Sequence, residues 1–398
     1  MLPSEGWKGN ALTSVIAPDT AVMERARSTV SSRPHWLRPG TRNTGGCRGP
    51  QPSYVPELDG LRGLAVAGVF AYHMCPRLRG TWMYYPASAG WSGVNLFFVL
   101  SGFLITSILL RTKETPHHYF RSFYARRVLR IWPVYFLLLA VCYLGPNWLL
   151  GTTLLGTSKW HALPALVLFV QNLFPVKLQG ALEPTWSLAI EEQYYLLWAP
   201  VVRFVRRPAH LAGGLAALLA LSPLLRLKCG PALNPAHTLL HLDCITFGSL
   251  LGLGIASASF ARHTWLRIGF ASTVAGFGSL ATLADGTVFA DSALGLGFAG
   301  IVLMAVAGTG ASNPIAWLLR RGPLPFYGQI SYGLYLVQMP LIISLGALVL
   351  LIDHSRIGGN WEANLAIVAI EFLACTAVAL LLWHGLESRI LRLKRHLA

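Results

Sequence analysis

The sequence predicts an all-α fold, a polytopic integral membrane bundle of about ten transmembrane helices. Of its 398 residues, 54% are hydrophobic and only 12% are charged, whereas ordinary soluble proteins are about one-quarter charged. Its mean hydropathy is +0.52. A helix needs ~20 apolar residues to cross a bilayer, and the intervals 80–110, 131–158 and 322–352 contain no Asp, Glu, Lys or Arg. These observations argue against a soluble cytoplasmic enzyme.

Residues 1–52 differ in composition from the rest of the chain. They are rich in Pro, Gly, Ser and Thr, and seven basic residues outnumber three acidic ones. No apolar run in them reaches the length of a signal peptide. We predict a disordered basic cytoplasmic N-terminal tail, followed by a single membrane-embedded domain over 53–398.

Eleven apolar segments follow the tail, at 60–75, 91–110, 131–150, 160–174, 186–203, 210–226, 243–259, 265–284, 291–308, 328–352 and 363–385. The basic loops favour ten crossings, because Lys and Arg gather on the cytoplasmic side. If the short segment 160–174 does not cross, five basic clusters and the tail share one side. These clusters are Arg111 to Arg130, Arg203 to Arg207, Arg262 to Arg267, Arg320 with Arg321, and Arg389 to Arg395. The prediction is a multi-pass cell-membrane protein, of the bacterial inner-membrane type, with both termini cytoplasmic.

The formal charge of +16 could indicate nucleic acid binding. The hydrophobicity argues otherwise, because excess Lys and Arg in cytoplasmic loops explains the charge without a nucleic acid partner. The six cysteines show no CxxC or Cys/His spacing, so we predict small core residues and no metal site.

Two ionisable residues stand in the first apolar segment. Arg62 and His73 are eleven residues apart, which advances a helix by about 20° past three turns and by about 16 Å. They therefore share one helix face. Ionisable residues inside a membrane usually mark function, although a structural core histidine is the alternative.

The stretch before the third long apolar segment carries Arg127 and Arg130, three residues apart and so on one helical face. Guanidinium groups recognise phosphate through two parallel hydrogen bonds. Spacing alone leaves phosphate binding and ordinary cytoplasmic anchoring equally open.

Two further segments place polar groups inside apolar runs. Glu191 and Glu192 lie one to two turns into a segment that also contains Ser187, and both carboxylates cannot face lipid. A structural ion pair with an arginine of another span is the alternative. A polar stripe with Tyr332, Tyr335 and Gln338 could line a cavity or join helices. Glu371 is a further buried acid without an assigned role.

At these residues the chain resembles the membrane-bound acyltransferase 3 family, which includes O-acetylases of polysaccharide and lipopolysaccharide and macrolide acyltransferases. The resemblance runs from about residue 56 to 387. The matching pieces are Leu58-Asp-Gly-Leu-Arg62-Gly-Leu-Ala, the spacing to His73, the run from Gly93 to Thr106, Arg127-x-x-Arg130, Trp186-Ser-Leu-Ala-Ile-Glu-Glu-Gln-Tyr-Tyr195 and Ile330-Ser-Tyr-Gly-Leu-Tyr335.

The resemblance implies a ten-helix bundle, an acyl-CoA donor reached from the cytoplasm and acylation of a hydroxyl on a glycan, lipid-linked sugar or secondary metabolite. Acyl-CoA is then a co-substrate, and no cofactor is bound permanently. It suggests His73 as the catalytic residue and Arg62, Arg127 and Arg130 as the donor-binding residues.

Two departures from the family pattern concern the C-terminal third. The family often has His-x-Pro where this chain has Gln338-Met-Pro340, and Glu-x-Pro where it has Glu387-Ser-Arg389.

The sequence leaves several mechanisms open. His73 could act as a general base, with Glu191 or Glu192 orienting the imidazole, or could itself carry the acyl group. The alternative from another class is a transporter of lipid, glycan precursors or acyl groups. The sequence shows neither the inverted repeat nor the paired broken helices typical of transporters.

Overall fold

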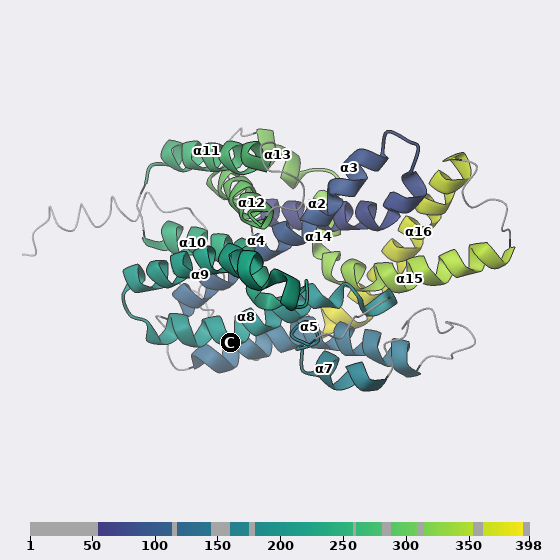
Figure 1. The fold of residues 1–398 in the computed structure, drawn as a ribbon, viewed down its shortest axis with the longest axis horizontal. Coiled ribbons are helices and arrows are strands. Elements are labelled where there is room, and N and C mark those ends of the chain that lie inside the picture. Colours follow the sequence, from purple (N-terminus) through teal and green to yellow (C-terminus); the bar gives the residue numbers. More distant parts are fainter. Residues whose placement is uncertain are drawn as a thin grey trace, which may run out of the picture.

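The computed structural model describes residues 55–113, 118–144, 160–174, 180–257, 260–280, 288–308, 314–352 and 361–392. Within these ranges the regular secondary structure is helical and no strand occurs. The helices pack into one bundle, with α11 and α12 on one flank and α15 and α16 extending together on the other (Figure 1). The predicted all-α class is confirmed. The predicted tail, 1–52, lies outside the described residues.

Ten long helices make up most of the described chain. They are α2 (Pro56–Met74), α4 (Gly93–Thr112), α5 (Tyr119–Leu144), α8 (Thr185–Phe204), α9 (Pro208–Cys229), α10 (Leu242–Ser257), α11 (Arg262–Leu280), α12 (Ala290–Ala307), α15 (Ser331–Ile352) and α16 (Trp361–Leu382). Short helices connect them: α3 (Tyr84–Ser88), α7 (Leu163–Val167), α13 (Pro314–Arg320), α14 (Leu324–Gln329) and α17 (Ser388–Arg392). A π-helical turn, Trp383–Glu387, joins α16 to α17.

Six described helical stretches are long and apolar enough to cross a membrane, so the chain is built as a multi-pass membrane protein. They contain α4, α5, α9, α12, α15 and α16, and α10 is a shorter apolar helix. Both α2 and α8 carry charged residues in their first half, and the count of ten crossings stays a prediction. Segment 160–174 contains a 3-10 turn, Trp160–Ala162, and the five-residue α7. Helix α7 spans about 8 Å, so the segment is too short to cross as a helix.

Glycines bring the start of α2 into backbone contact with α13 and α14. A Cβ atom on Gly60 would overlap the carbonyl of Leu319, and one on Gly63 would overlap the carbonyl of Leu324. Small residues allow this close approach between membrane helices. An ion pair of 2.8 Å between Glu57 Oε1 and Arg320 Nε adds a second tie. The cytoplasmic end predicted for α2 is therefore tightly fixed.

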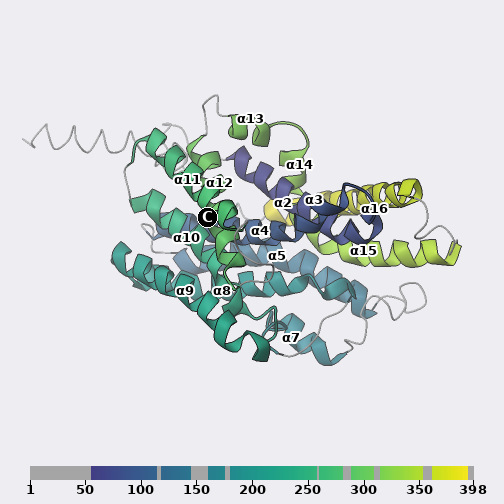
Figure 2. The ribbon, with the colours of Figure 1, turned by 45° about the horizontal axis from the view of Figure 1, so that its top comes forward.

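The buried apolar side chains form two clusters. The larger one joins α4, α5, α8, α10 and α12. The smaller one lies between α2, α15 and α16 and includes Phe70, Leu334 and Cys375. In the view of Figure 2, α2, α4, α5 and α15 converge near the centre of the bundle. The five cysteines in the described ranges are free thiols, and four of them are buried.

Candidate active site

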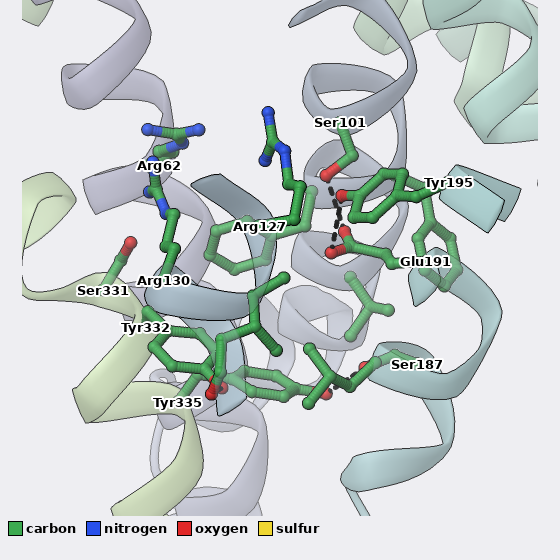
Figure 3. A pocket seen from close by; sticks show the side chains of 15 residues that line it. Arg62, Ser101, Arg127, Arg130, Ser187, Glu191, Tyr195, Ser331, Tyr332 and Tyr335 are labelled. Carbon is green, nitrogen blue, oxygen red and sulfur yellow. Dashed lines mark hydrogen bonds between the residues drawn. The ribbon is translucent and has the colours of Figure 1, made fainter. Parts of the chain in front are cut away.

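A pocket lies where α2, α4, α5, α8 and α15 meet. Its lining combines charged, hydroxyl and aromatic side chains. They are Arg62, Val94, Phe97, Phe98, Ser101, Arg127, Arg130, Ile131, Ser187, Leu188, Glu191, Tyr195, Ser331, Tyr332 and Tyr335. Figure 3 shows the three arginine side chains at one end of the pocket and the Ser187–Tyr335 pair at the other.

The arginine end of the pocket carries more positive charge than the described residues neutralise. Arg62 makes a long contact of 3.4 Å from Nη1 to Oδ1 of Asp59. Arg127 stacks over the ring of Tyr195, with 5.3 Å from its guanidinium carbon to the ring centroid. Within the described ranges, neither Arg127 nor Arg130 forms an ion pair with a carboxylate. Such an end favours an anionic ligand.

Glu191 is the carboxylate that lines the pocket. Its Oε1 accepts a hydrogen bond of 2.6 Å from Ser101 Oγ, and its Oε2 accepts one of 3.0 Å from Tyr195 Oη (Figure 3). The neighbouring Glu192 is not part of the lining. Its buried Oε1 has no hydrogen-bond partner in the part of the chain that the structure describes. Three guanidinium groups thus face one pocket carboxylate.

The opposite end of the pocket is closed by hydroxyl groups. Ser187 Oγ and Tyr335 Oη are hydrogen-bonded at 2.7 Å, and Tyr335 Oη donates to the carbonyl of Pro184 at 2.9 Å. Tyr332 Oη donates to the carbonyl of Ile131 at 2.6 Å. These bonds tie α15 to α8 and α5.

His73 lies on the same continuous helix as Arg62, as the sequence predicts, but does not belong to the pocket lining. Its ring lies beside Gln338 of α15. No hydrogen bond joins His73 to Glu191 or Glu192 in the described ranges, and its buried Nδ1 has no partner there. Gln338 is fully buried, and in the described ranges neither polar atom of its side chain reaches a partner at hydrogen-bonding geometry, although its amide lies close enough to the His73 ring to interact with it.

The structure therefore brings together seven of the residues that the sequence singles out: Arg62, Arg127, Arg130, Ser187, Glu191, Tyr332 and Tyr335. It places His73 and Gln338 next to one another, outside that lining. Sequence reasoning missed Ser101 and Tyr195, which hold Glu191. A signal was present for both, since Ser101 is a hydroxyl in an apolar run and Tyr195 follows Glu191 by one helical turn.

A second charged cluster lies at the start of α10 and α12, and its charged residues are not part of the pocket lining. Arg226 Nη2 contacts Asp243 Oδ2 at 2.6 Å, and Arg226 Nη1 contacts Asp291 Oδ2 at 3.4 Å. His241 Nδ1 lies 3.2 Å from the same Asp291 oxygen. Asn95 Nδ2 donates to Asp291 Oδ1 at 3.0 Å. This cluster is internally paired.

Glu371, the buried acid without an assigned role, pairs with Arg77. Arg77 Nη2 lies 2.5 Å from Glu371 Oε1, and Arg77 Nε donates to Oε2 at 3.1 Å. This bidentate ion pair joins the segment after α2 to α16. In the described ranges no group of three or more His, Cys, Asp or Glu residues is arranged to hold a metal ion.

The fold and the pocket describe a multi-pass helical membrane protein with an arginine-rich pocket. Residues 55–384 match the family model described as an acyltransferase domain. The chain therefore belongs to the acyltransferase 3 family, as its motifs predict.

Characterised relatives carry related names. The chain is 29% identical over 354 residues to the peptidoglycan O-acetyltransferase OatA of Listeria monocytogenes, covering 81% of this chain and 54% of that protein. It is 29% identical to the O-acetyltransferase OatA of Staphylococcus aureus, covering 73% and 51%, respectively. The putative peptidoglycan O-acetyltransferase YrhL of Bacillus subtilis is also 29% identical, covering 73% and 49%. The chain thus spans about half the length of these relatives. No solved structure matches it.

Proposed function

We propose that the chain transfers a short acyl group, such as acetyl, from cytoplasmic acyl-CoA to a hydroxyl group of a glycan. The observation that carries this proposal is the arginine end of the pocket. Arg127 and Arg130 line it without a carboxylate partner in the described ranges, and Arg62 of the His73 helix joins them. Family membership supplies acyl transfer as the reaction class.

The donor phosphates would bind at the arginine end. Guanidinium groups fit phosphate oxygens in pairs, and α2 leads from Arg62 toward His73 over eleven residues, about 16 Å. An extended thioester arm can then lie along α2. Glu191 is fixed by Ser101 and Tyr195 beside Arg127, so we assign it to the donor end.

His73 would act on the acceptor. The imidazole takes the proton of the acceptor hydroxyl while the hydroxyl oxygen attacks the thioester carbonyl. The carbon–sulfur bond breaks, and the CoA thiolate leaves and receives the proton from the imidazolium. In the alternative route, His73 itself attacks the carbonyl and then passes the acyl group to the hydroxyl.

The acceptor is assigned by analogy with the relatives. Two of them are named for peptidoglycan O-acetylation, so a cell-wall glycan is the first acceptor to test, with lipid-linked sugars and secondary metabolites next. We place the protein in a bacterial inner membrane with both termini in the cytoplasm. This topology puts the arginines near the cytoplasmic acyl-CoA pool.

The test uses the full chain purified in detergent, with acetyl-CoA, soluble peptidoglycan fragments and a thiol-detecting reagent. We expect acceptor-dependent thiol release. His73→Gln keeps size and hydrogen bonding but loses the base, so its rate should fall on the order of 10²–10⁴-fold with unchanged folded yield. Full activity in this variant would make His73 a structural residue.

Two further measurements separate the alternatives. Labelled acetyl-CoA without acceptor should leave an acid-labile acyl group on the wild type, absent from His73→Gln, if the covalent route operates. A transporter would instead release no thiol with any acceptor and would move acyl donor or glycan precursor into proteoliposomes.

A further inference from the structure

The Gln338 side chain is buried without a well-formed hydrogen bond in the described ranges, although its amide interacts with the His73 ring. It is fully inaccessible, and both its Oε1 and its Nε2 have no partner in the described ranges. A primary amide offers two donors and an acceptor, and leaving them unmet inside a protein is costly. A buried amide in this state needs a hydrogen-bonding partner among the groups around it.

His73, which neighbours Gln338 in space, also lacks a hydrogen bond at one ring nitrogen in the described ranges. The His73 ring lies beside Gln338, and its buried Nδ1 also lacks a partner. Two facing side chains with complementary donors and acceptors, both incompletely bonded, are positioned for one another. By contrast, Gln193 on α8 donates to the carbonyl of Phe169 at 2.7 Å and to Asn172 Oδ1 at 2.8 Å.

The placement of Gln338 along α15 connects it to the pocket. Tyr332 and Tyr335 line the pocket, and Gln338 follows Tyr335 by three residues, about 4.5 Å further along the helix. The polar stripe of α15 thus begins at the donor pocket and ends beside His73. It marks a path from the pocket to the imidazole.

We propose that Gln338 is the positioning residue of His73. Its Oε1 accepts a hydrogen bond from Nδ1–H of the imidazole, which fixes the tautomer and leaves Nε2 free to take the proton of the acceptor hydroxyl. This is the role that a carboxylate plays in hydrolase triads, here filled by a neutral amide. The proposal rests on the function proposed above, with His73 as base.

The first variant to test is Gln338→Leu, assayed by thiol release from acetyl-CoA. The kcat should fall about tenfold or more, and less than in His73→Gln. The KM for acetyl-CoA should stay within about twofold, because the phosphate-binding end is untouched. Its thermal midpoint should change little, since no well-formed hydrogen bond of the described residues is lost. Gln193→Leu is the matched control, and it should lower the midpoint while leaving kcat per folded protein unchanged.

The pH profile of the Gln338→Glu variant is a second test, because a merely structural role of Gln338 would leave that profile unchanged. The carboxylate still accepts from Nδ1–H, so kcat should exceed that of Gln338→Leu. Its negative charge favours the imidazolium, so the acidic limb of the pH profile of kcat should move to higher pH.

Three results would overturn the assignment. The first is wild-type kcat in Gln338→Leu, and the second is a pH profile of Gln338→Glu that matches the wild type. The third is absence of thiol release by the wild type, which removes the proposed function together with this inference. Wild-type activity that depends on His73 but not on Gln338 removes the inference alone.

Discussion

Arginines occur in two charged regions of this bundle, and the regions differ in what faces them. Arg226 lies among Asp243, Asp291 and the Ser292 hydroxyl, and Asp243 is fully buried. Arg127 and Arg130 line a pocket that contains one carboxylate, which is already bound by a serine and a tyrosine. Arginine is thus paired with carboxylates in the first region, whereas in the second the guanidinium groups of Arg127 and Arg130 have no carboxylate partner among the described residues.

The difference separates two uses of a charge inside a membrane protein. A buried ion pair must be complete, because removing one partner leaves an uncompensated charge. An arginine that binds a ligand must keep its donors free until the ligand arrives. Replacing members of the two groups should therefore affect different quantities.

The largest effect is expected for Arg226→Met. It leaves Asp243 buried without its cation, and breaking a buried pair in this way costs about 3–5 kcal/mol. We expect a marked fall in the thermal midpoint and in folded yield, measured by fluorescence-detected size exclusion in detergent. Adding Asp243→Asn to this variant should restore part of the loss. A stable single variant would show that the pairing contributes little.

A smaller and different effect is expected for Arg127→Met. Loss of charge-assisted bonds to phosphate, about 1.5–3 kcal/mol, should raise the KM for acetyl-CoA by about tenfold or more. Stability should change by only about 1 kcal/mol, the scale of the stacking on Tyr195. Arg126→Met is the matched control, because Arg126 bonds to its own helix at Ser122 and lies outside the pocket lining. Equal KM values in the Arg127→Met and Arg126→Met variants would show that Arg127 does not bind the donor and serves only as a basic residue on the predicted cytoplasmic side.

The smallest effect concerns His241, which lies between α9 and α10 at the edge of the Arg226 cluster. Burial alone would lower the pKa of His241, but its hydrogen bond to Asp291 and the charges of Asp291 and Asp243 raise it above its usual value. Protonated His241 therefore stabilises the fold below about pH 6.5, and this contribution is lost as pH rises through the folded-state pKa.

Thermal midpoints of the wild type and His241→Gln, measured between pH 6 and 9, check this expectation. The advantage of the wild type should be largest at the acidic end and should shrink as pH rises. A constant difference across that range would contradict it.

Features that depend on one segment were predictable from the sequence. An arginine and a histidine eleven residues apart in an apolar run predict one helix with both on it, and α2 has this form. The clustering of Arg62, Arg127 and Arg130 followed from family motifs, because spacing cannot show that α2 and α5 meet. The helix of the third predicted apolar segment, α5, begins at Tyr119, whereas the apolar segment begins at 131. The arginine-rich stretch before that segment is also helical.

Features that depend on pairing between distant segments were not predictable. Arg77 and Glu371 are 294 residues apart in the chain. The sequence around either residue does not indicate the other as its partner. The same holds for Ser101 and Glu191, whose bond joins α4 to α8. Short helices such as α13 and α14 are too brief for a periodic pattern, although their backbone contacts fix α2.

The helix α2, whose start is held by glycine contacts, has a consequence for the length of the proposed donor. Arg62 and His73 lie on one continuous helix, so the interval between them is set by α2 itself, whose first turns are fixed against α13 and α14. That interval of eleven residues sets a span of about 16 Å. In the function proposed above, the donor carries its anionic group and its reactive carbon that far apart. Acetyl phosphate, whose phosphate adjoins the acyl group, would not reach both ends at once, so the proposal predicts selection of a long-armed donor.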